Sequence, residues 1–341
     1  MSIKGGGTCH LFLLSCHLAF TINLVIERYI FVKKWFLIVA FVMLTISVMG
    51  QQEASFAHYW AMEPSFNPGA VGKESKINAV GAYNMSFAGY EHNPRTIYLA
   101  ADMPLRFLGA YHGVGLQLMN DEIGLFSHKR VLLQYAYKQK LFGGTLSIGI
   151  QGGMLSEGFK GSEVDTEQPE DPVFTTTDAN GTAMDLSAGL YYQHKNWYAG
   201  VSVLHATAPS IEIGDRSIFE MSRMFYLTGG YNIRLRNPFF TIHPSVLART
   251  DGSAYRVDVT ARVKYTHDRK MLYAGVGYSP SNSVTAMIGG NFHGICLGYS
   301  YEMFTSGTGL GNGCHELFVG YQTELNLYKK GRNRHQSVRI L

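Results

Sequence analysis

The sequence has few charged residues for its length. Only 16% of its 341 residues are Asp, Glu, Lys or Arg, while 46% are hydrophobic, whereas a typical soluble domain is about 25% charged. A surface that faces water needs more charge than this, and a surface that faces lipid needs little. The formal net charge is only +4, so the composition gives no argument for binding to nucleic acid.

Long hydrophobic runs are also absent beyond the N-terminal 50 residues. No later stretch reaches the roughly 18 uninterrupted apolar residues that a membrane-spanning helix needs. Because lipid cannot satisfy open backbone groups, a membrane protein without such helices must be a closed β-barrel. The composition and this absence together predict a transmembrane barrel.

Sequence motifs for catalysis and for metal or cofactor binding are missing. The pair His315-Glu316 is not followed by the second His of a zinc-binding H-E-x-x-H helix. No Gly-rich phosphate loop with Lys-Ser/Thr is found, and no Cys-x-x-Cys. We therefore expect no catalytic residue, metal site or cofactor, and we expect that the protein is not an enzyme.

Cysteine is scarce, with four residues in all. Cys9 and Cys16 precede residue 50, and Cys296 and Cys314 lie at opposite ends of two neighbouring predicted strands. At about 3.3 Å per residue the latter two should be roughly 20 Å apart, whereas a disulfide needs Cα atoms within about 7 Å. We expect no bridge between them.

The N-terminus is typical of an exported protein. Lys33-Lys34 precedes the apolar run 35–49, which is the order of regions in a signal peptide. We expect residues 1–50 to be a leader that is cleaved near Gln51. The alternative is that 11–26 and 35–49 form two membrane helices. A start codon assigned too early would account for the residues before the two lysines.

After the leader, apolar and polar residues alternate with a period of two. In 255–265 the odd positions are Tyr, Val, Val, Ala, Val and Tyr, and the even positions are Arg, Asp, Thr, Arg and Lys. Similar alternation is found in 131–138, 145–151, 182–190 and 295–302. This period predicts strands with one apolar and one polar face. Their length of about ten residues suits a tilted strand that crosses a bilayer.

The pattern predicts an all-β fold, a transmembrane antiparallel barrel of about fourteen strands. The expected strands are 75–88, 96–104, 110–119, 128–139, 145–157, 182–193, 197–206, 223–234, 239–250, 254–266, 270–279, 283–292, 294–304 and 314–326. Links at one end are short, as at 143–144 and 194–196, and those at the other end include the long loops 158–181 and 207–222. Long outer loops and short inner turns are typical of such barrels. Aromatic residues near strand ends predict a girdle at the membrane interfaces: Trp197, Tyr198, Tyr278, Phe292 and Phe304.

The segments outside these strands differ in composition. Residues 51–74 do not alternate and contain two prolines, so we expect a non-strand segment that plugs the lumen or lies at its periplasmic mouth. We expect the barrel over 75–328 and a basic periplasmic tail over 329–341. The loop 158–181 is acidic and lacks an apolar core, which is typical of a solvated loop; a cation or partner site is the alternative.

Several short phrases occur in a fixed order along the mature chain. They are 55–60 (Ser-Phe-Ala-His-Tyr-Trp), 66–72 (Phe-Asn-Pro-Gly-Ala-Val-Gly), 102–105 (Asp-Met-Pro-Leu), 120–124 (Asn-Asp-Glu-Ile-Gly), 198–202 (Tyr-Ala-Gly-Val-Ser), 298–301 (Gly-Tyr-Ser-Tyr) and 315–316 (His-Glu). Their order and spacing resemble the PorP/SprF family of type IX secretion outer-membrane proteins of Bacteroidota. One departure is the stretch 83–87, Tyr-Asn-Met-Ser-Phe, where the family usually shows Arg-x-Gln-Trp.

The resemblance implies a protein of the cell outer membrane without catalytic activity that serves type IX secretion and gliding motility. The implied partners are periplasmic ring or anchoring proteins of the machine, a secreted adhesin or its sorting domain, and outer-membrane lipid. The candidate partner-binding residues are Phe56, Tyr59, Trp60, Asn67 and Pro68. The alternative for the three aromatic residues is that they pack inside the barrel mouth. A second hypothesis, of a different class, is a diffusion channel for small or apolar solutes.

Charged residues on the polar faces of the strands are expected to line the lumen. They are Arg256, Asp258, Arg262, Lys264 and Glu302. They could line an open pore, pair with one another, or hold the segment 51–74 as a plug. A barrel of fourteen strands is wide enough that something besides its own side chains must fill or wet it.

Overall fold

The computed structural model describes residues 53–163, 177–214, 217–268, 270–305 and 313–325. The expected leader, the tail 329–341 and much of the acidic loop lie outside these residues. In the part of the chain that the structure describes, no helix is long and apolar enough to cross a membrane.

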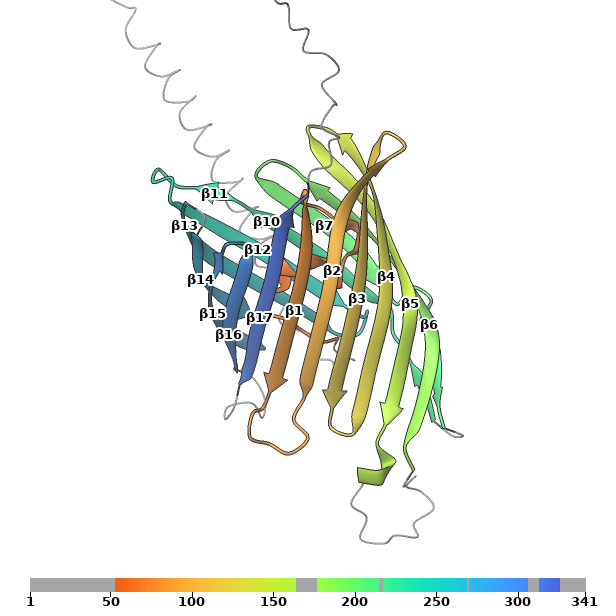
Figure 1. Ribbon diagram of the computed structural model, residues 1–341. Coiled ribbons are helices and arrows are strands. Elements are labelled where there is room, and N and C mark those ends of the chain that lie inside the picture. Colours follow the sequence, from red (N-terminus) through yellow and green to blue (C-terminus); the bar gives the residue numbers. More distant parts are fainter. Residues whose placement is uncertain (1–52, 164–176, 215–216, 269, 306–312, 326–341) are drawn as a thin grey trace, which may run out of the picture. The chain divides into compact units, whose positions relative to one another are not determined.

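A single antiparallel sheet closes on itself (Figure 1). The wall strands are β1 (Lys76–Ser86), β2 (Arg95–Phe107), β3 (Ala110–Ile123), β4 (Phe126–Leu141), β5 (Gly144–Phe159), β6 (Ala179–Gln193), β7 (Trp197–Leu204), β10 (Met224–Tyr231), β11 (Ile233–Arg234), β12 (Phe240–Thr250), β13 (Tyr255–His267), β14 (Lys270–Ser279), β15 (Ser283–Phe292), β16 (Ile295–Phe304) and β17 (Cys314–Glu324). The seam is the pairing of β1 with β17, and β10 pairs with both β7 and β12. Because β11 continues β10 after Asn232, the wall is a closed barrel of fourteen strands.

The predicted barrel is confirmed, and its strands lie at the positions that the alternation of apolar and polar residues predicts. The largest difference in a strand bound is at β3, which was expected to end at residue 119 and ends at Ile123. Two details were wrong. The strand expected over 223–234 is interrupted at Asn232, whose backbone N–H donates to Asn196 O of a neighbouring link at 2.7 Å. The stretch 207–222, expected to be a loop, contains a separate hairpin of β8 (Ser210–Ile213) and β9 (Ser217–Glu220).

The outer face of the wall is apolar and the inner face is polar, which is the reverse of the arrangement in a soluble protein. Outward-facing Leu133 and Met184 are 67% and 71% exposed, whereas inward-facing Gln134 and Asp185 are 4% and 1% exposed. Exposed apolar side chains in contact with water would be costly, so this outer surface fits a lipid environment. The polar groups that a hydrocarbon solvent cannot satisfy are directed into the lumen.

The two ends of the barrel have different connections. At the end we call the turn end, tight two-residue turns join neighbouring strands, and both residues have positive φ: Leu108 and Gly109 at 49° and 77°, and Phe142 and Gly143 at 48° and 77°. Turns of this kind match the twist of paired strands. The opposite, loop end has the longer links, including the stretch 205–223 with its hairpin.

Not all of the five aromatic residues expected to form girdles face outward. Trp197, Tyr278 and Phe292 are 39%, 56% and 42% exposed on the outside of the wall. Tyr198 was placed wrongly, because its ring stacks on that of inward-facing Tyr191 at 5.7 Å between centroids. It contributes to the lumen and not to the outer surface.

The strand register separates the two described cysteines. Cys296 lies opposite Gly320, and Cys314 lies opposite Glu302. Six positions of β16, from 296 to 302, therefore separate them along the strand axis, or roughly 20 Å. This is the spacing that was expected, and both thiols are free.

Candidate functional site: the barrel lumen

The lumen contains the chain that precedes β1, residues 53–75, which we call the inner segment. It forms three 3-10 turns, η1 (Tyr59–Ala61), η2 (Glu63–Ser65) and η3 (Pro68–Ala70), visible in orange inside the wall in Figure 1. Proline at the start of η2 and η3 favours such turns, since it presets φ and removes an N–H that would have no partner there. The inner segment begins near the loop end, where Glu53 contacts Arg130, and joins β1 at the turn end.

The turn η3 is held against the wall through Asn67. Its Oδ1 accepts the Gly69 N–H at 2.8 Å, and its Nδ2 donates to Leu190 O of β6 at 3.0 Å. Asn67 is 1% exposed and Pro68 is buried. The side chain thus caps a turn and ties it to a strand at the same time.

Inward-facing glycines of the wall leave room for this approach. A Cβ on Gly149 of β5 would lie 2.2 Å from Gly69 N and from Pro68 C, and one on Gly189 of β6 would lie 2.2 Å from Asn67 Oδ1. No side chain fits at either position unless the inner segment moves. The strands and the inner segment are therefore matched in shape.

Phe56 and Tyr59 are buried, at 9% and 3% exposure. The Phe56 ring lies 5.5 Å from that of Tyr98 on β2, and the Tyr59 hydroxyl lies 2.9 Å from Ser245 Oγ on β12. These contacts attach the segment to opposite parts of the wall. In this conformation both side chains pack inside the barrel, so their contact with a partner stays a prediction that requires the segment to move.

Trp60 is only half-buried and lies beneath two cations of β13. The Arg262 guanidinium carbon is 3.7 Å from the Trp60 ring centroid, and Lys264 Nζ is 5.7 Å from it. Cation–π contact of this kind is strongest where water is excluded. Two of the five predicted lumen-lining residues thus face the inner segment.

The other three predicted lumen residues pair with one another at the loop end. Arg256 Nε lies 2.8 Å from Asp258 Oδ1, and its Nη2 lies 2.7 Å from Glu302 Oε1. Ser283 Oγ also donates to Glu302. This network joins β13, β15 and β16 and leaves these charges compensated.

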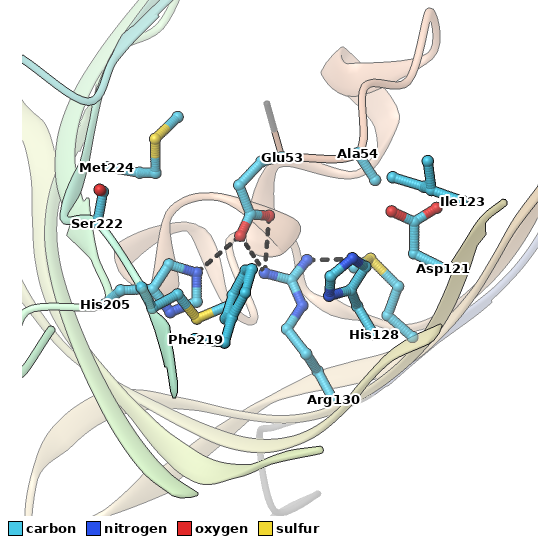
Figure 2. Close-up of a pocket in the computed structure, with 12 residues that line it drawn as sticks. Glu53, Ala54, Asp121, Ile123, His128, Arg130, His205, Phe219, Ser222 and Met224 are labelled. Atoms are coloured by element: carbon cyan, nitrogen blue, oxygen red, sulfur yellow. Dashed lines mark hydrogen bonds and ion pairs between the residues drawn. The ribbon is translucent and has the colours of Figure 1, made fainter. Parts of the chain in front are cut away.

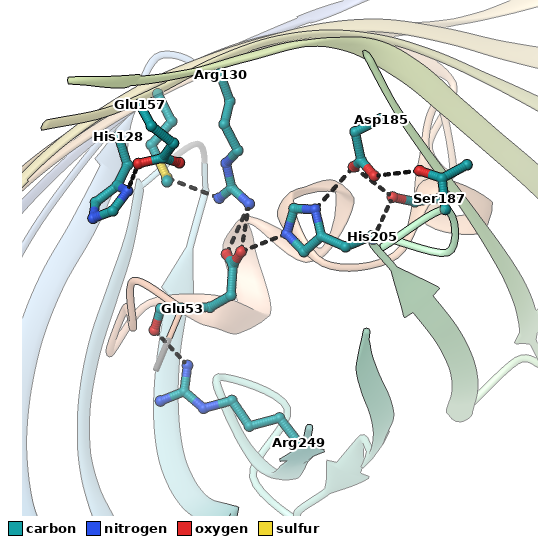
Figure 3. Close-up of polar contacts among 10 residues, drawn as sticks. Glu53, His128, Arg130, Glu157, Asp185, Ser187, His205 and Arg249 are labelled. Atoms are coloured by element: carbon teal, nitrogen blue, oxygen red, sulfur yellow. Dashed lines mark hydrogen bonds and ion pairs between the residues drawn. The ribbon is translucent and has the colours of Figure 1, made fainter. Parts of the chain in front are cut away.

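Sequence reasoning missed a buried polar network that attaches the inner segment and begins at Glu53 (Figure 3). Glu53 Oε2 lies 2.7 Å from Arg130 Nη1 on β4, and Oε1 lies 2.7 Å from His205 Nε2. His205 Nδ1 lies 3.0 Å from Asp185 Oδ2 on β6, and Arg249 Nη1 donates to the Glu53 carbonyl at 3.3 Å. Two carboxylates and two cations alternate through this network.

The electrostatics of the network keep Glu53 and His205 charged. Burial alone would raise the pKa of Glu53, but Arg130 and His205 outweigh it and hold that pKa well below its usual range. Burial would lower the pKa of His205, yet hydrogen bonds to Asp185 and Glu53 raise it to about 9. At neutral pH the Glu53 carboxylate and the His205 ring are therefore both charged.

A second missed attachment joins His58 to Glu316 on β17. The His58 Nδ1 and Glu316 Oε1 atoms are 2.5 Å apart, and the Glu316 carboxylate also accepts the N–H groups of Ala57 and His58 at 2.7 and 3.0 Å. A charged residue in mid-strand on an inward position, as Glu316, Arg130 and Asp185 are, was the available signal. Sequence alone could not show that Glu316 and Arg130 would contact the segment before β1, or that Asp185 would contact His205.

A cavity of about 200 Å³ lies beside the Glu53 network at the loop end. Figure 2 shows Glu53 projecting into it between His205 and Arg130. Phe219 of β9 and Met224 at the start of β10 supply apolar wall. The cavity thus combines charged groups, already paired, with an apolar lining.

A larger cavity of about 370 Å³ lies on the other side of the inner segment, at the turn end. Trp60, Lys73 and Lys76 line it together with Arg262 and Lys264. Among the described residues, no group of His, Cys, Asp and Glu is arranged to hold a metal ion. The chemistry that the lumen offers is the binding of charged or amphipathic groups.

Comparison with known proteins gives one family. The family model described as type IX secretion system membrane protein PorP/SprF matches residues 48–321. No protein with a curated description matches the sequence.

Solved structures with a similar fold have low sequence identity. The monoaromatic hydrocarbon channel CymD is 11% identical, with a TM-score of 0.49 over 79% of this chain and 94% of its own. The Pseudomonas putida toluene transporter TodX is 11% identical, with a TM-score of 0.46 over 82% of this chain and 96% of its own. A Pseudomonas aeruginosa FadL homologue is 9% identical, with a TM-score of 0.45 over 76% of this chain and 93% of its own.

Proposed function

Because this outer-membrane barrel belongs to the PorP/SprF family of type IX secretion system membrane proteins, we propose that it docks other components of the machine. The proposed partners are periplasmic ring or anchoring proteins and a secreted adhesin or its sorting domain. In bacterial outer-membrane barrels the short turns face the periplasm and the long loops face outside. The turn end is then the surface for periplasmic partners, and the loop end is the surface for secreted ones.

The observation that carries this proposal is the pair of apolar side chains at the tips of the turn end. Leu108 and Phe142 are 93% and 86% exposed, at positions with positive φ where Gly, Asn or Asp is usual. A bulky side chain in that conformation is unfavourable. Large apolar groups held at exposed tips, despite that cost, are typical of a protein contact.

The attachments of the inner segment support docking over transport. Wall strands on several sides hold it, through Arg130, Glu316, Ser245 and Leu190. A lumen filled in this way provides a rigid body for partners at both ends. The proposed contact of a partner with the inner segment requires the partner to displace that segment. The residues concerned are Phe56, Tyr59, Trp60, Asn67 and Pro68.

Photo-crosslinking in native envelopes tests the docking proposal. A photoreactive phenylalanine analogue at Phe142 should crosslink to periplasmic machine proteins. The same analogue at Leu186, which is 56% exposed on the lipid-facing wall, is the matched control and should give only lipid adducts. If neither Phe142 nor Leu108 yields a protein adduct in cells that secrete normally, docking at the turn end is wrong.

A diffusion channel for small or apolar solutes is the second candidate. The loop-end cavity favours it, because Met119, Phe219 and Met224 give that cavity an apolar lining. Swelling of liposomes that contain the purified barrel discriminates between the two functions. Rapid swelling with the intact inner segment would favour the channel, and no swelling favours the docking body.

A further inference from the structure

We propose that the turn-end cavity contains an anion-binding site, formed by Arg262 and Lys264 over Trp60, that takes a carboxylate of an acidic peptide from a periplasmic partner. The proposal deepens the docking function and rests on it. Its first basis is geometric: β13 directs both cations into the same cavity of about 370 Å³, two residues apart on one face. A cation pair at this spacing can contact one carboxylate together.

Neither cation forms a direct ion pair with a carboxylate among the described residues. Arg262 is 4% exposed, and its Nε and Nη1 atoms have no hydrogen-bond partner. Lys264 is near Trp60 and forms none of the ion pairs of the described chain. Buried charge without compensation is unfavourable, and cation–π contact with one ring compensates only part of it.

The acidic groups that line the same cavity are already engaged. Glu63 Oε2 lies 2.5 Å from Lys73 Nζ, and Glu74 pairs with Lys76 at 3.6 Å. Asp102, the third, accepts hydrogen bonds from Gly72 N at 2.7 Å and from Asn78 Nδ2 at 3.0 Å. The positive charge of Arg262 and Lys264 is therefore available to a ligand that brings its own carboxylate.

The remaining lining indicates what kind of anion fits. Ala61, Pro64 and Phe318 supply apolar surface beside the cations, so an amphipathic ligand suits the cavity better than a bare inorganic ion. The chain's own residues 326–341 are an unsuitable occupant, because five of them are Lys or Arg and like charges repel. An acidic peptide with small or apolar spacers matches both features.

Calorimetric titration of the detergent-solubilised full-length protein tests the site. The probe is the N-acetylated, amidated peptide Glu-Gly-Glu-Gly-Glu-Gly, and the comparison peptide has Gln for each Glu. We expect the Glu peptide to bind and the Gln peptide not to bind. Lys264→Met should raise the dissociation constant roughly tenfold, as loss of one hydrogen bond to a charged group would.

Lys140→Met is the matched control, since Lys140 is exposed at the same end and absent from the cavity lining; it should change the dissociation constant less than about twofold. Arg262→Met is the second variant, and heat-modifiable mobility on a gel shows whether each barrel is folded. Equal binding by Lys264→Met and the parent protein overturns the site. Phosphate that binds as tightly as the Glu peptide overturns the peptide assignment. Normal crosslinking at Phe142 alongside either result would leave the docking function standing.

Discussion

At the scale of single residues, the ionic contact of Glu53 with Arg130 determines how firmly the inner segment is held. The side chains are 12% and 6% exposed, and removing one partner of a buried pair leaves an uncompensated charge that typically costs about 3–5 kcal/mol. Arg130→Met should lower the free energy of unfolding by about that amount, measured by urea titration in lipid vesicles. Lys129→Met, at the exposed neighbouring position, should change it by less than about 0.5 kcal/mol. Equal effects of the two substitutions would contradict this account.

His205 makes the stability of the protein depend on pH. Its pKa is raised from 6.5 to about 9 in the folded protein, so the folded state binds more protons than the unfolded state between these values. The resulting stabilisation, about 3 kcal/mol, is fully present below about pH 6.5 and is lost as the pH rises through about 9. Unfolding measured from pH 6 to pH 10 should show this decline in the parent protein and a smaller decline in His205→Asn. Parallel curves would show that His205 is not the group responsible.

Contacts of single side chains were also the least predictable feature from the sequence. Arg262 and Lys264 were expected in the lumen because they fall on the polar face of an alternating segment, and they lie there. The partner of Arg130 could not be predicted, because Glu53 is 77 positions away and the inner segment has no period to fix its direction. The burial of Phe56 and Tyr59 depends on the same long-range contacts.

At the scale of elements, the match between the inner segment and the wall glycines gives a direct test. Gly149→Ala places a Cβ against the backbone of Gly69 and Pro68, which cannot yield without moving the segment. We expect faster protease cleavage within residues 53–75 while the barrel itself stays resistant. Limited proteolysis followed by mass spectrometry measures this.

Gly152→Ala is the control for that experiment. Its Cβ would meet the flexible end of the Leu186 side chain at 2.9 Å, which can turn away into lipid. Cleavage within the inner segment should then stay at the parental rate. If both variants are equally resistant, the close fit at Gly149 is not what holds the segment.

Strands were the most predictable elements, because the two faces of each strand have different surroundings. Because one face contacts lipid and the other the polar lumen, each wall strand shows its period in the sequence, as β13 does from Tyr255 to Tyr265. The hairpin of β8 and β9 was missed because its strands have four residues each. Its Ile211 packs against Leu155 of β5, and no local sequence pattern predicts this contact.

At the scale of the whole molecule, the inner segment should determine whether the barrel conducts ions. Deleting residues 53–70 removes the three 3-10 turns and leaves a fourteen-strand wall with an unfilled interior. We expect single-channel conductance in planar bilayers to rise roughly tenfold over the parent protein, since a barrel of this width without a plug is water-filled. A parent protein that already conducts as well as the deletion variant would show that the segment does not block the lumen.

The seam between β1 and β17 has a consequence for biogenesis. His58 is near the start of the described chain, and its carboxylate, Glu316, comes 258 residues later. The chain that precedes β1 is thus synthesised long before the strand that holds it, and the ring stays open until β17 pairs with β1. A chain truncated before residue 314 would lack both β17, which closes the barrel, and Glu316, which holds His58. Such an open barrel would be exposed to the quality-control proteases of the envelope.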